Sequence, residues 1–462
     1  MKALLIIHDL HQDDNYFPLG PAYLASIMRE KGVEVTVACQ DIYHWSNDEL
    51  VRRYIKGKEW DIIGLGFLSA RFTETVLPLC KEINKHKGDA KLVLGGIGST
   101  TAPEYTQKVT DANIIACGEL ENGIMDIFDM EDCIFHCPPV KKLDTIPFPA
   151  WDLFPMDKYI NCIQYQEMDP KEKSMQIVTS RGCINKCTFC SRTVKGIRLR
   201  SPQNIVKEMK ELYDRYNITY FEIQDELFIP QKKRLLGFID ELKKADLLGK
   251  VKYAISIRAD LVKDETVRLL KGSGCKFISI GFESVTQEVL DEMKKNVTVE
   301  DNYNAARILK KHNMLFGINF IWGMPSDNEE TLQKSVNFMK KFNSYSELRT
   351  IRMITPYPGS ELYYDALDQG LLSGPQDFFD KFKNSDLITV NFTKYSTEDC
   401  YKMLFEANCE LINDHFMKRD GWCFEKFDNA PDRLSMIQDF HDLYFGTGDK
   451  RKFRGARHYE KK

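Results

Sequence analysis

The chain has 462 residues, of which 43% are hydrophobic and 29% are charged, and its formal net charge is -4 at pH 7. This length exceeds one ordinary hydrophobic core, so two or three domains are expected. Because acidic and basic residues are interspersed, nothing favours binding to nucleic acid or to an anionic membrane surface. No apolar stretch is long enough to cross a bilayer, and the start MKALLIIHDL lacks a signal cleavage site, so we expect a cytoplasmic protein. In such a reducing compartment the 13 cysteines are thiols or metal ligands.

Residues 1–130 alternate short apolar runs with amphipathic helical patterns. Alternation of this kind predicts a parallel sheet with helices on both faces. Several glycines fall at the predicted strand ends, at the edge of the sheet where ligands bind in open α/β folds. The predicted strands are 3–7, 34–38, 61–66, 91–94 and 113–116, and the predicted helices are 20–31, 47–55 and 72–86.

Residues 131–174 are rich in proline and poor in periodicity, which predicts an interdomain linker. A second alternating array occupies 175–374 and favours a barrel or partial (β/α)6 barrel, whose chemistry sits at the carboxyl ends of the strands. Residues 375–462 are aromatic-rich and predict a mainly helical region. In the array the predicted strands are 175–180, 219–224, 251–256, 276–281, 315–321 and 348–354, and the helices are 203–216, 232–244, 264–271, 299–312 and 329–342.

Three cysteines follow directly on the strand predicted at 175–180, in the segment SRGCINKCTFCS. Three thiolates in one short loop can hold a soft metal site, and a four-iron cluster bound by three thiolates leaves one iron open for a small molecule. A structural zinc ion is the alternative, but it needs a fourth Cys or His, and no nearby C-x-x-C pair supplies one. We therefore favour a [4Fe-4S] cluster on Cys183, Cys187 and Cys190.

The spacing CxxxCxFC resembles the signature of radical S-adenosylmethionine (SAM) enzymes, and segments such as SIRAD at 256–260 and IGFESVTQEV at 280–289 extend the resemblance. In that family SAM binds the open iron and is cleaved to a 5′-deoxyadenosyl radical, which abstracts hydrogen from unactivated C–H bonds. Relatives usually carry an acidic pair and then a small or polar residue after the second strand, where this chain reads QDEL. The resemblance implies that SAM is bound by Ser256, Arg258 and Glu283, with Gln224 and Asp225 lining the same site.

Four N-terminal segments, beginning with NYFPLGPAYL, WDIIGLGFLS, LVLGGIGST and IIACGELENG, resemble in order the cobalamin-binding domain of one branch of that family. The resemblance implies a Rossmann-like domain that presents cobalamin to the barrel, with the nucleotide tail of the cofactor at the sheet edge. Relatives usually read GEGE where this chain has GELE at 118–121, and often carry a His at the place of Gly98, so we expect Leu120 to narrow the cofactor site. The implied cobalamin contacts are Leu19, Ser69, Thr73, Gly95, Gly96, Gly98, Gly118 and Glu119.

Two weaker motifs leave alternatives open. Asp9 and His11 fall where another cobalamin fold class carries the axial-histidine motif DxHxxG, but the glycine is missing here. We expect no protein ligand to cobalt, with His8 or His11 as the alternative. Cys133 and Cys137 form a CxxxC pair, which we interpret as two linker thiols, with a second cluster as the alternative.

The two resemblances together predict a cobalamin-dependent radical SAM enzyme that methylates an unactivated carbon of a small molecule. One alternative is a cobalamin-dependent cyclase or rearrangement enzyme, in which no methyl group is transferred. A methylthiotransferase is disfavoured because the N-terminal thiols are scattered and the last region reads as helical. A non-catalytic cobalamin sensor is disfavoured because a binding module needs no cysteine triplet.

By the same analogy, a flavodoxin or ferredoxin is the expected electron donor. The C-terminal region is expected to close the barrel mouth and select the substrate. Aromatic side chains there are candidates to line a pocket, although aromatics at helical spacing are more often core residues. These candidates are Tyr395, Tyr401, Trp422 and Phe424.

Overall fold

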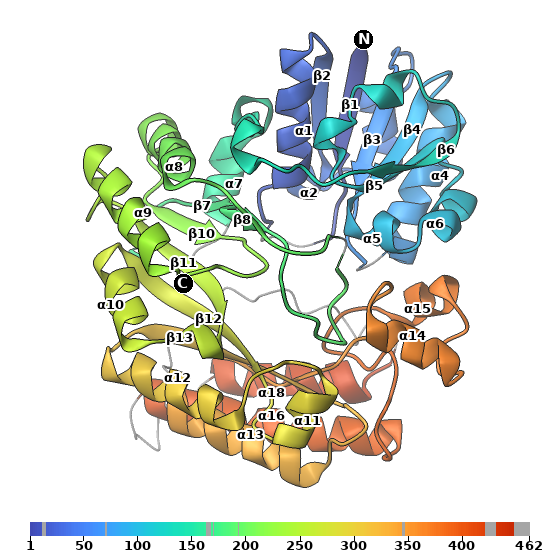
Figure 1. The fold of residues 1–462 in the computed structure, drawn as a ribbon. Coiled ribbons are helices and arrows are strands. Elements are labelled where there is room, and N and C mark those ends of the chain that lie inside the picture. Colours follow the sequence, from blue (N-terminus) through green and yellow to red (C-terminus); the bar gives the residue numbers. More distant parts are fainter. Residues whose placement is uncertain are drawn as a thin grey trace.

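The computed structural model describes residues 1–11, 15–69, 72–162, 168–169, 171–192, 194–343, 347–420 and 431–447. The chain forms an N-terminal α/β unit, a half-open parallel barrel and a helical C-terminal region (Figure 1). The predicted α/β class with a partial barrel is confirmed. In the described part of the chain, no helix is long and apolar enough to span a membrane.

The N-terminal sheet has six parallel strands in the order β2-β1-β3-β4-β5-β6. Along β1, Ala3 and Leu5 pack in one core and Leu4 and Ile6 in another, so both faces of the sheet are buried under helices. The strand order changes direction at β1, and sheets of this kind bind ligands beyond the carboxyl ends of such strands. The elements are β1 (Lys2–Ile7), α1 (Leu19–Glu30), β2 (Glu34–Cys39), α2 (Gln40–Tyr43), α3 (Asn47–Tyr54), β3 (Ile62–Gly66), a π-helical turn (Phe72–Val76), α4 (Leu77–His86), β4 (Lys91–Gly95), α5 (Gly96–Thr101), α6 (Pro103–Thr110), β5 (Ile114–Gly118) and β6 (Cys133–Cys137).

The sixth strand lies inside the stretch predicted as a linker. Residues of β6 pair in parallel with those of β5, from Cys133 beside Ile114 to Cys137 beside Gly118. The prolines begin only at Pro138, and proline ends a strand because it has no N–H to donate. The N-terminal sheet therefore continues beyond residue 130, and helix α7 (Met156–Cys162) interrupts the stretch that follows.

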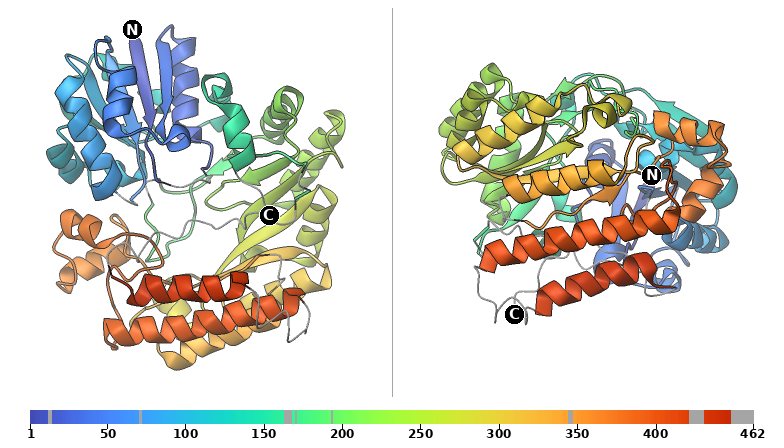
Figure 2. Two further views of the ribbon diagram at one scale, coloured as in Figure 1. Left: turned by 180° about the vertical axis from the view of Figure 1, so that it is seen from behind. Right: turned by 90° about the horizontal axis from the view of Figure 1, so that it is seen from below.

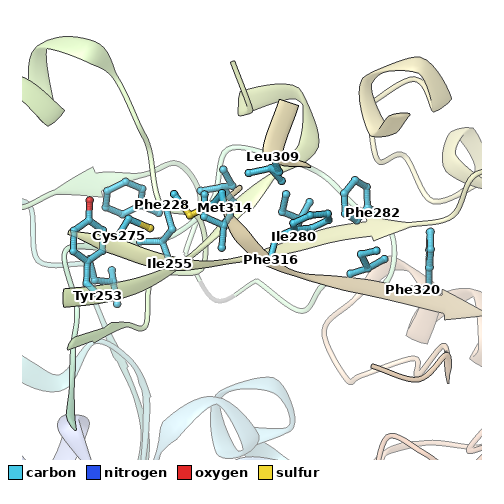
Figure 3. Packing of buried hydrophobic residues seen from close by; sticks show 14 of the residues in the cluster. Phe228, Tyr253, Ile255, Cys275, Ile280, Phe282, Leu309, Met314, Phe316 and Phe320 are labelled. Atoms are coloured by element: carbon cyan, nitrogen blue, oxygen red, sulfur yellow. The ribbon is translucent and has the colours of Figure 1, made fainter. Parts of the chain in front are cut away.

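The second sheet also has six parallel strands, in the order β14-β13-β12-β11-β10-β7. Figure 3 shows Ile255, Ile280 and Phe316 pointing to the same side of the strands, toward Leu309 of α12. Because side chains alternate along a strand, the residues between them line the opposite, concave face. The elements are β7 (Ser174–Ile177), β8 (Ser180–Arg181), β9 (Arg198–Leu199), α8 (Pro202–Tyr216), β10 (Tyr220–Ile223), α9 (Lys232–Lys244), β11 (Lys252–Arg258), α10 (Asp264–Gly272), β12 (Cys275–Glu283), α11 (Gln287–Glu292), α12 (Val299–Lys311), β13 (Leu315–Trp322), α13 (Glu329–Phe342) and β14 (Arg352–Met353).

The C-terminal region packs against both units. Helices α14 (Glu361–Asp368) and α15 (Pro375–Lys381) lie beside the N-terminal unit, where Phe379 stacks on Tyr105 with ring centroids 5.7 Å apart. Helices α16 (Thr397–Asp420) and α18 (Pro431–Phe445) lie side by side next to α13, on the underside of the barrel (Figure 2). Tyr401 stacks on Tyr444 in the hydrophobic core there, Tyr395 is partly buried against the same core, and Trp422 and Phe424 lie outside the described residues.

Candidate active site

The three cysteines lie on a hairpin whose base is the antiparallel pair β8 and β9. Gly182 opens the loop with φ +87°, and a Cβ atom there would overlap the carbonyl oxygen of Gly196, so only glycine fits. Cys183 forms a bridge with Lys195 across the loop. In Figure 1 the hairpin that follows β8 lies between the two sheets, beyond the strands of both.

The hydrogen bond between Cys187 and Cys190 makes Cys187 the more acidic of the two thiols, because it lowers the pKa of Cys187 and raises that of Cys190. Cys187 is buried, and the backbone N–H of Cys190 donates to its carbonyl oxygen at 3.3 Å. A hydrogen bond from the Cys190 thiol lowers the pKa of Cys187 to about 6, and the positive charges of Lys295 and Arg258 act in the same direction. The thiolate is the ligand form of cysteine, so this environment suits a soft metal centre. The side-chain amide of Asn185 donates to the sulfur of Cys183 at 3.3 Å.

Within the described residues, no three His, Cys, Asp or Glu side chains converge as one metal ion would require. A four-iron cluster makes a different demand, because each thiolate binds a separate iron atom.

Asp225 serves the hairpin and not an open site. Its carboxylate accepts the backbone N–H groups of Thr179 and Ser180 at 2.6 and 2.9 Å, and the hydroxyl of Ser180 at 2.7 Å. Burial raises the pKa of this carboxyl, and these hydrogen bonds oppose the rise. The side chain thus holds the strand that leads into the cysteine loop. Its neighbour Gln224 is exposed and free of such constraint.

Arg258 and Glu283 lie near Cys187, at the carboxyl ends of β11 and β12. The Nε and Nη2 atoms of Arg258 donate to Asp260 and to the carbonyl oxygen of Asn296 at 2.9 and 3.0 Å, whereas its buried Nη1 has no partner within the described residues. Glu283 has φ +63° and accepts from Lys295 at 2.8 Å. A buried guanidinium nitrogen without an acceptor is suited to an anionic group such as a carboxylate.

The concave face of the barrel sheet carries a polar row. Ser256 is exposed on β11, and the amide of Asn319 donates to the hydroxyl of Ser279 at 2.9 Å across β13 and β12. The sequence pattern predicted Ser256 as a site residue but did not indicate Lys295, Ser279 or Asn319. The signal for the last two was the alternation of polar residues with Ile and Phe along each strand.

The carboxyl edge of the N-terminal sheet faces the hairpin (Figure 1). There Leu68 is 65% exposed, and Ser69 is half-buried beside it. Gly96 has φ +88°, and a Cβ atom there would lie 2.7 Å from the carbonyl oxygen of Phe67. Gly98 makes room for the ring of Phe67, while a Cβ atom on Gly95 would make an ordinary contact, 3.8 Å from the carbonyl oxygen of Ala116.

Four other predicted cobalamin contacts already have protein partners. The hydroxyl of Thr73 donates to the carbonyl oxygen of Phe379 at 3.4 Å, and Leu19 packs partly against the large core. Gly118 donates its N–H to Thr100 at 3.2 Å, and Glu119 binds Arg198. Leu120, expected to narrow the cofactor site, instead packs against the core under α1.

The histidines beside β1 differ in their surroundings. His8 is buried, its Nε2 has no partner within the described residues, and burial lowers its pKa to about 4. His11 is exposed and its Nδ1 lies 3.0 Å from Asp9, whose same oxygen is 3.0 Å from Nδ1 of His44. Nδ1 of His11 is therefore engaged by Asp9, whereas His8 offers a buried ring nitrogen without a partner within the described residues.

Cys133 and Cys137 lie on one strand, four residues apart. At the rise of a β-strand their Cα atoms are separated by ~13 Å. This spacing keeps the two thiols apart, whereas Cys187 and Cys190 lie close enough for a hydrogen bond between their thiols.

Comparison with known proteins defines the class. Residues 177–339 match the model of the radical SAM superfamily, so this part of the chain is a radical SAM domain. The protein is a radical SAM enzyme, and the domain implies a [4Fe-4S] cluster and SAM as cofactors. The cysteine triplet and the polar row of the concave face both fall in this domain.

Individual relatives extend the likeness over both units. An uncharacterised methyltransferase of Pyrococcus horikoshii is 28% identical over 86% of this chain and 85% of its own length. The anaerobic magnesium-protoporphyrin IX monomethyl ester cyclase of Rubrivivax gelatinosus is 27% identical over 80% of this chain and 70% of its own. The solved structure of the radical SAM methyltransferase TsrM of Kitasatospora setae, with cobalamin and a [4Fe-4S] cluster bound, has a TM-score of 0.64 at 16% identity and covers 80% of this chain and 75% of that one. The two-unit fold is therefore shared with that enzyme.

The residues fit the implied groups. Three thiols on one hairpin, one of them with a lowered pKa, suit an iron–sulfur cluster, and the unpartnered Nη1 of Arg258 suits the carboxylate of SAM. The carboxyl edge of the N-terminal sheet suits a flat, largely apolar macrocycle such as a corrin. It presents the exposed side chain of Leu68, the glycines at the end of β4 and the neutral ring nitrogen of His8.

Proposed function

We propose that the protein is a cobalamin-dependent radical SAM methyltransferase that acts on an unactivated carbon of a small molecule. The observation that carries the proposal is the placement of the cysteine hairpin between the polar concave face of the barrel and the carboxyl edge of the N-terminal sheet. The likeness to methyltransferases, one of them with cobalamin bound, supports it. When bound, the cluster and SAM supply a carbon-centred radical, and cobalamin supplies a methyl group.

The residues of the chain have distinct tasks in this proposal. Cys183, Cys187 and Cys190 bind the cluster, and Arg258, with Ser256 and Gln224, binds SAM. Glu283 orients Lys295 beside the cluster. Leu68, Ser69 and the glycines at 95, 96 and 98 receive cobalamin. Asp225 and Thr73 hold protein segments in place. A flavodoxin or ferredoxin supplies the electron.

The first test is the visible spectrum, with iron and corrin content, of protein produced without oxygen and with cobalamin supplied. We expect about four iron atoms and one corrin per chain, the cluster stoichiometry of this superfamily. Replacing all three hairpin cysteines by alanine removes the iron, whereas Cys275→Ala, which changes a buried core thiol, keeps it. Iron without corrin in the wild-type protein would overturn the cobalamin part of the proposal.

A matched pair of variants tests where the corrin binds. Leu68→Glu places a charge on the proposed corrin surface and is expected to lower corrin content while iron stays unchanged. Leu236→Glu changes another exposed leucine, on α9, and is expected to lower neither.

Cyclisation or rearrangement without methyl transfer is the second candidate, favoured by the likeness to the anaerobic cyclase. Label from methyl-labelled SAM separates the two. Its appearance in the product supports methyl transfer, and product without label supports cyclisation.

A further inference from the structure

Two arginines face each other at the base of the cysteine hairpin. Arg181 of β8 pairs directly with Arg198 of β9. Like charges opposite each other destabilise a strand pair, and these two side chains are only 19% and 17% exposed. Their acidic partners come from the other unit of the fold, because Glu119 and Glu121 follow the end of β5.

The four charges are paired closely. The Nη1 and Nη2 atoms of Arg198 each donate to one oxygen of Glu119 at 2.6 Å, in a bidentate arrangement. Nη2 of Arg181 lies 2.6 Å from Glu121, and its Nη1 lies 3.7 Å from Glu119. The two carboxylates are 11% and 9% exposed, so water screens these interactions weakly.

The same charged side chains also contact uncharged partners. The N–H of Val140 donates to Glu119 at 2.7 Å, and Arg198 donates to the carbonyl oxygen of Val140 at the same distance. The guanidinium of Arg181 lies 5.6 Å from the ring centroid of Tyr23, on α1. Three separate segments of the N-terminal half thus converge on the hairpin base.

The path from the N-terminal sheet to the cluster ligands is short. Gly118, with φ +88°, turns the chain at the end of β5, and a Cβ atom there would lie 2.6 Å from the carbonyl oxygen of Cys137. Cys183 follows Arg181 by two residues. The first cluster ligand is therefore tied to the carboxyl edge of the N-terminal sheet through ion pairs that have little freedom to shift.

We propose that Glu119, Glu121, Arg181 and Arg198 form an interdomain clasp that fixes the cysteine hairpin on the N-terminal sheet and so sets the distance between cluster and cobalamin. The four are positioning residues, and none touches the reacting atoms. The part of this proposal that concerns the distance to cobalamin rests on the proposed function. The part that concerns attachment of the hairpin to the N-terminal sheet does not.

The test is a double-mutant cycle on the pair that joins the two units. Glu121→Gln, Arg181→Gln and the double variant are compared with the wild type, and Asp152→Asn is the control because it breaks the exposed Arg29–Asp152 pair. Iron per chain is measured first. The magnetic interaction between the reduced cluster and cob(II)alamin is then followed by pulsed EPR, and hydrogen exchange is measured in the peptide 182–192.

Each single variant is expected to keep its iron, to change the spin interaction and to raise exchange in 182–192 about tenfold. The double variant is expected to be no worse than the worse single variant, because partners that act through each other are not additive. The control is expected to match the wild type.

An unchanged spin interaction in both single variants would overturn the clasp, as would additive effects in the double variant. Loss of iron from all three variants would also overturn it, because the residues would then serve folding of the hairpin. If wild-type protein binds no corrin, the proposed function fails, and hydrogen exchange alone decides the clasp. In that case, hydrogen exchange in the peptide 182–192 that is as slow in the single variants as in the wild type would refute the clasp.

Discussion

At the scale of single residues, Arg258 combines two satisfied donors with one buried donor that has no partner. Arg258→Lys keeps the charge but removes the planar fork, so we expect the affinity for SAM to fall by about 10- to 100-fold, equivalent to about 1.4–2.8 kcal/mol. The measurement is a SAM titration that follows the EPR spectrum of the reduced cluster. Arg268→Lys, an exposed change on α10, is the control, and equal affinities in the two variants would contradict the assignment.

His8 predicts a pH dependence of stability. Burial lowers its pKa to about 4, whereas histidine in an unfolded chain titrates near 6.5. Between these values the unfolded state binds more protons, so the free energy of unfolding rises with pH from about 4 to about 6.5, by about 3 kcal/mol. The free energy of unfolding is measured by urea denaturation at several pH values in this range. For His8→Gln we expect it to rise less steeply with pH than it does for the wild type. The exposed control His136→Gln is expected to keep the wild-type slope, and a wild-type slope in both variants would refute the prediction.

At the scale of elements, the cysteine hairpin depends on its first glycine. Gly182 and Gly196 both have positive φ, but a Cβ atom would meet backbone only at Gly182. Gly196→Ala is expected to cost about 1–2 kcal/mol from the left-handed conformation alone and to retain iron. Gly182→Ala must also displace the facing strand, so iron content is expected to fall by more than half. Equal iron contents after anaerobic reconstitution would show that the close approach is unimportant.

Hydrophobic periodicity predicted the elements of the barrel well, because each helix faces one core. Helices α9 and α13 begin and end at the residues that the sequence predicts. Neighbouring residues fix the start of α13, because the side chains of Asn328 and Thr331 each accept the backbone N–H of the other in a capping box. Strand β6 was missed because its edge position leaves half-buried residues beside a proline run.

Side-chain roles were harder to predict than elements. Asp225 and Glu119 stand at strand ends, as cofactor ligands would, yet their partners are Thr179 and Ser180 in one case and Arg198 in the other. Those partners are 45 to 79 residues away in the sequence, and no periodic pattern records which of them a carboxylate will meet. The cysteine triplet could be predicted from the sequence because its three residues are close together in the chain.

At the scale of the whole molecule, the C-terminal region joins the barrel to the N-terminal unit through Phe379. Its ring is 2% exposed and lies 4.8 Å from Phe72 and 5.7 Å from Tyr105, centroid to centroid. Phe379→Ala removes this contact at a cost of about 3–5 kcal/mol, typical of a buried phenylalanine. Because α16 packs on α13 and α18, we expect that part of the molecule to stay folded. Hydrogen exchange should therefore rise in 72–86 and 375–383 and remain unchanged in 397–412. Tyr364→Ala, which removes a side chain that is 55% exposed on α14, should change neither region. A uniform rise across all three segments would mean that the C-terminal region and the N-terminal unit unfold together, and that Phe379 is not a separable joint between them.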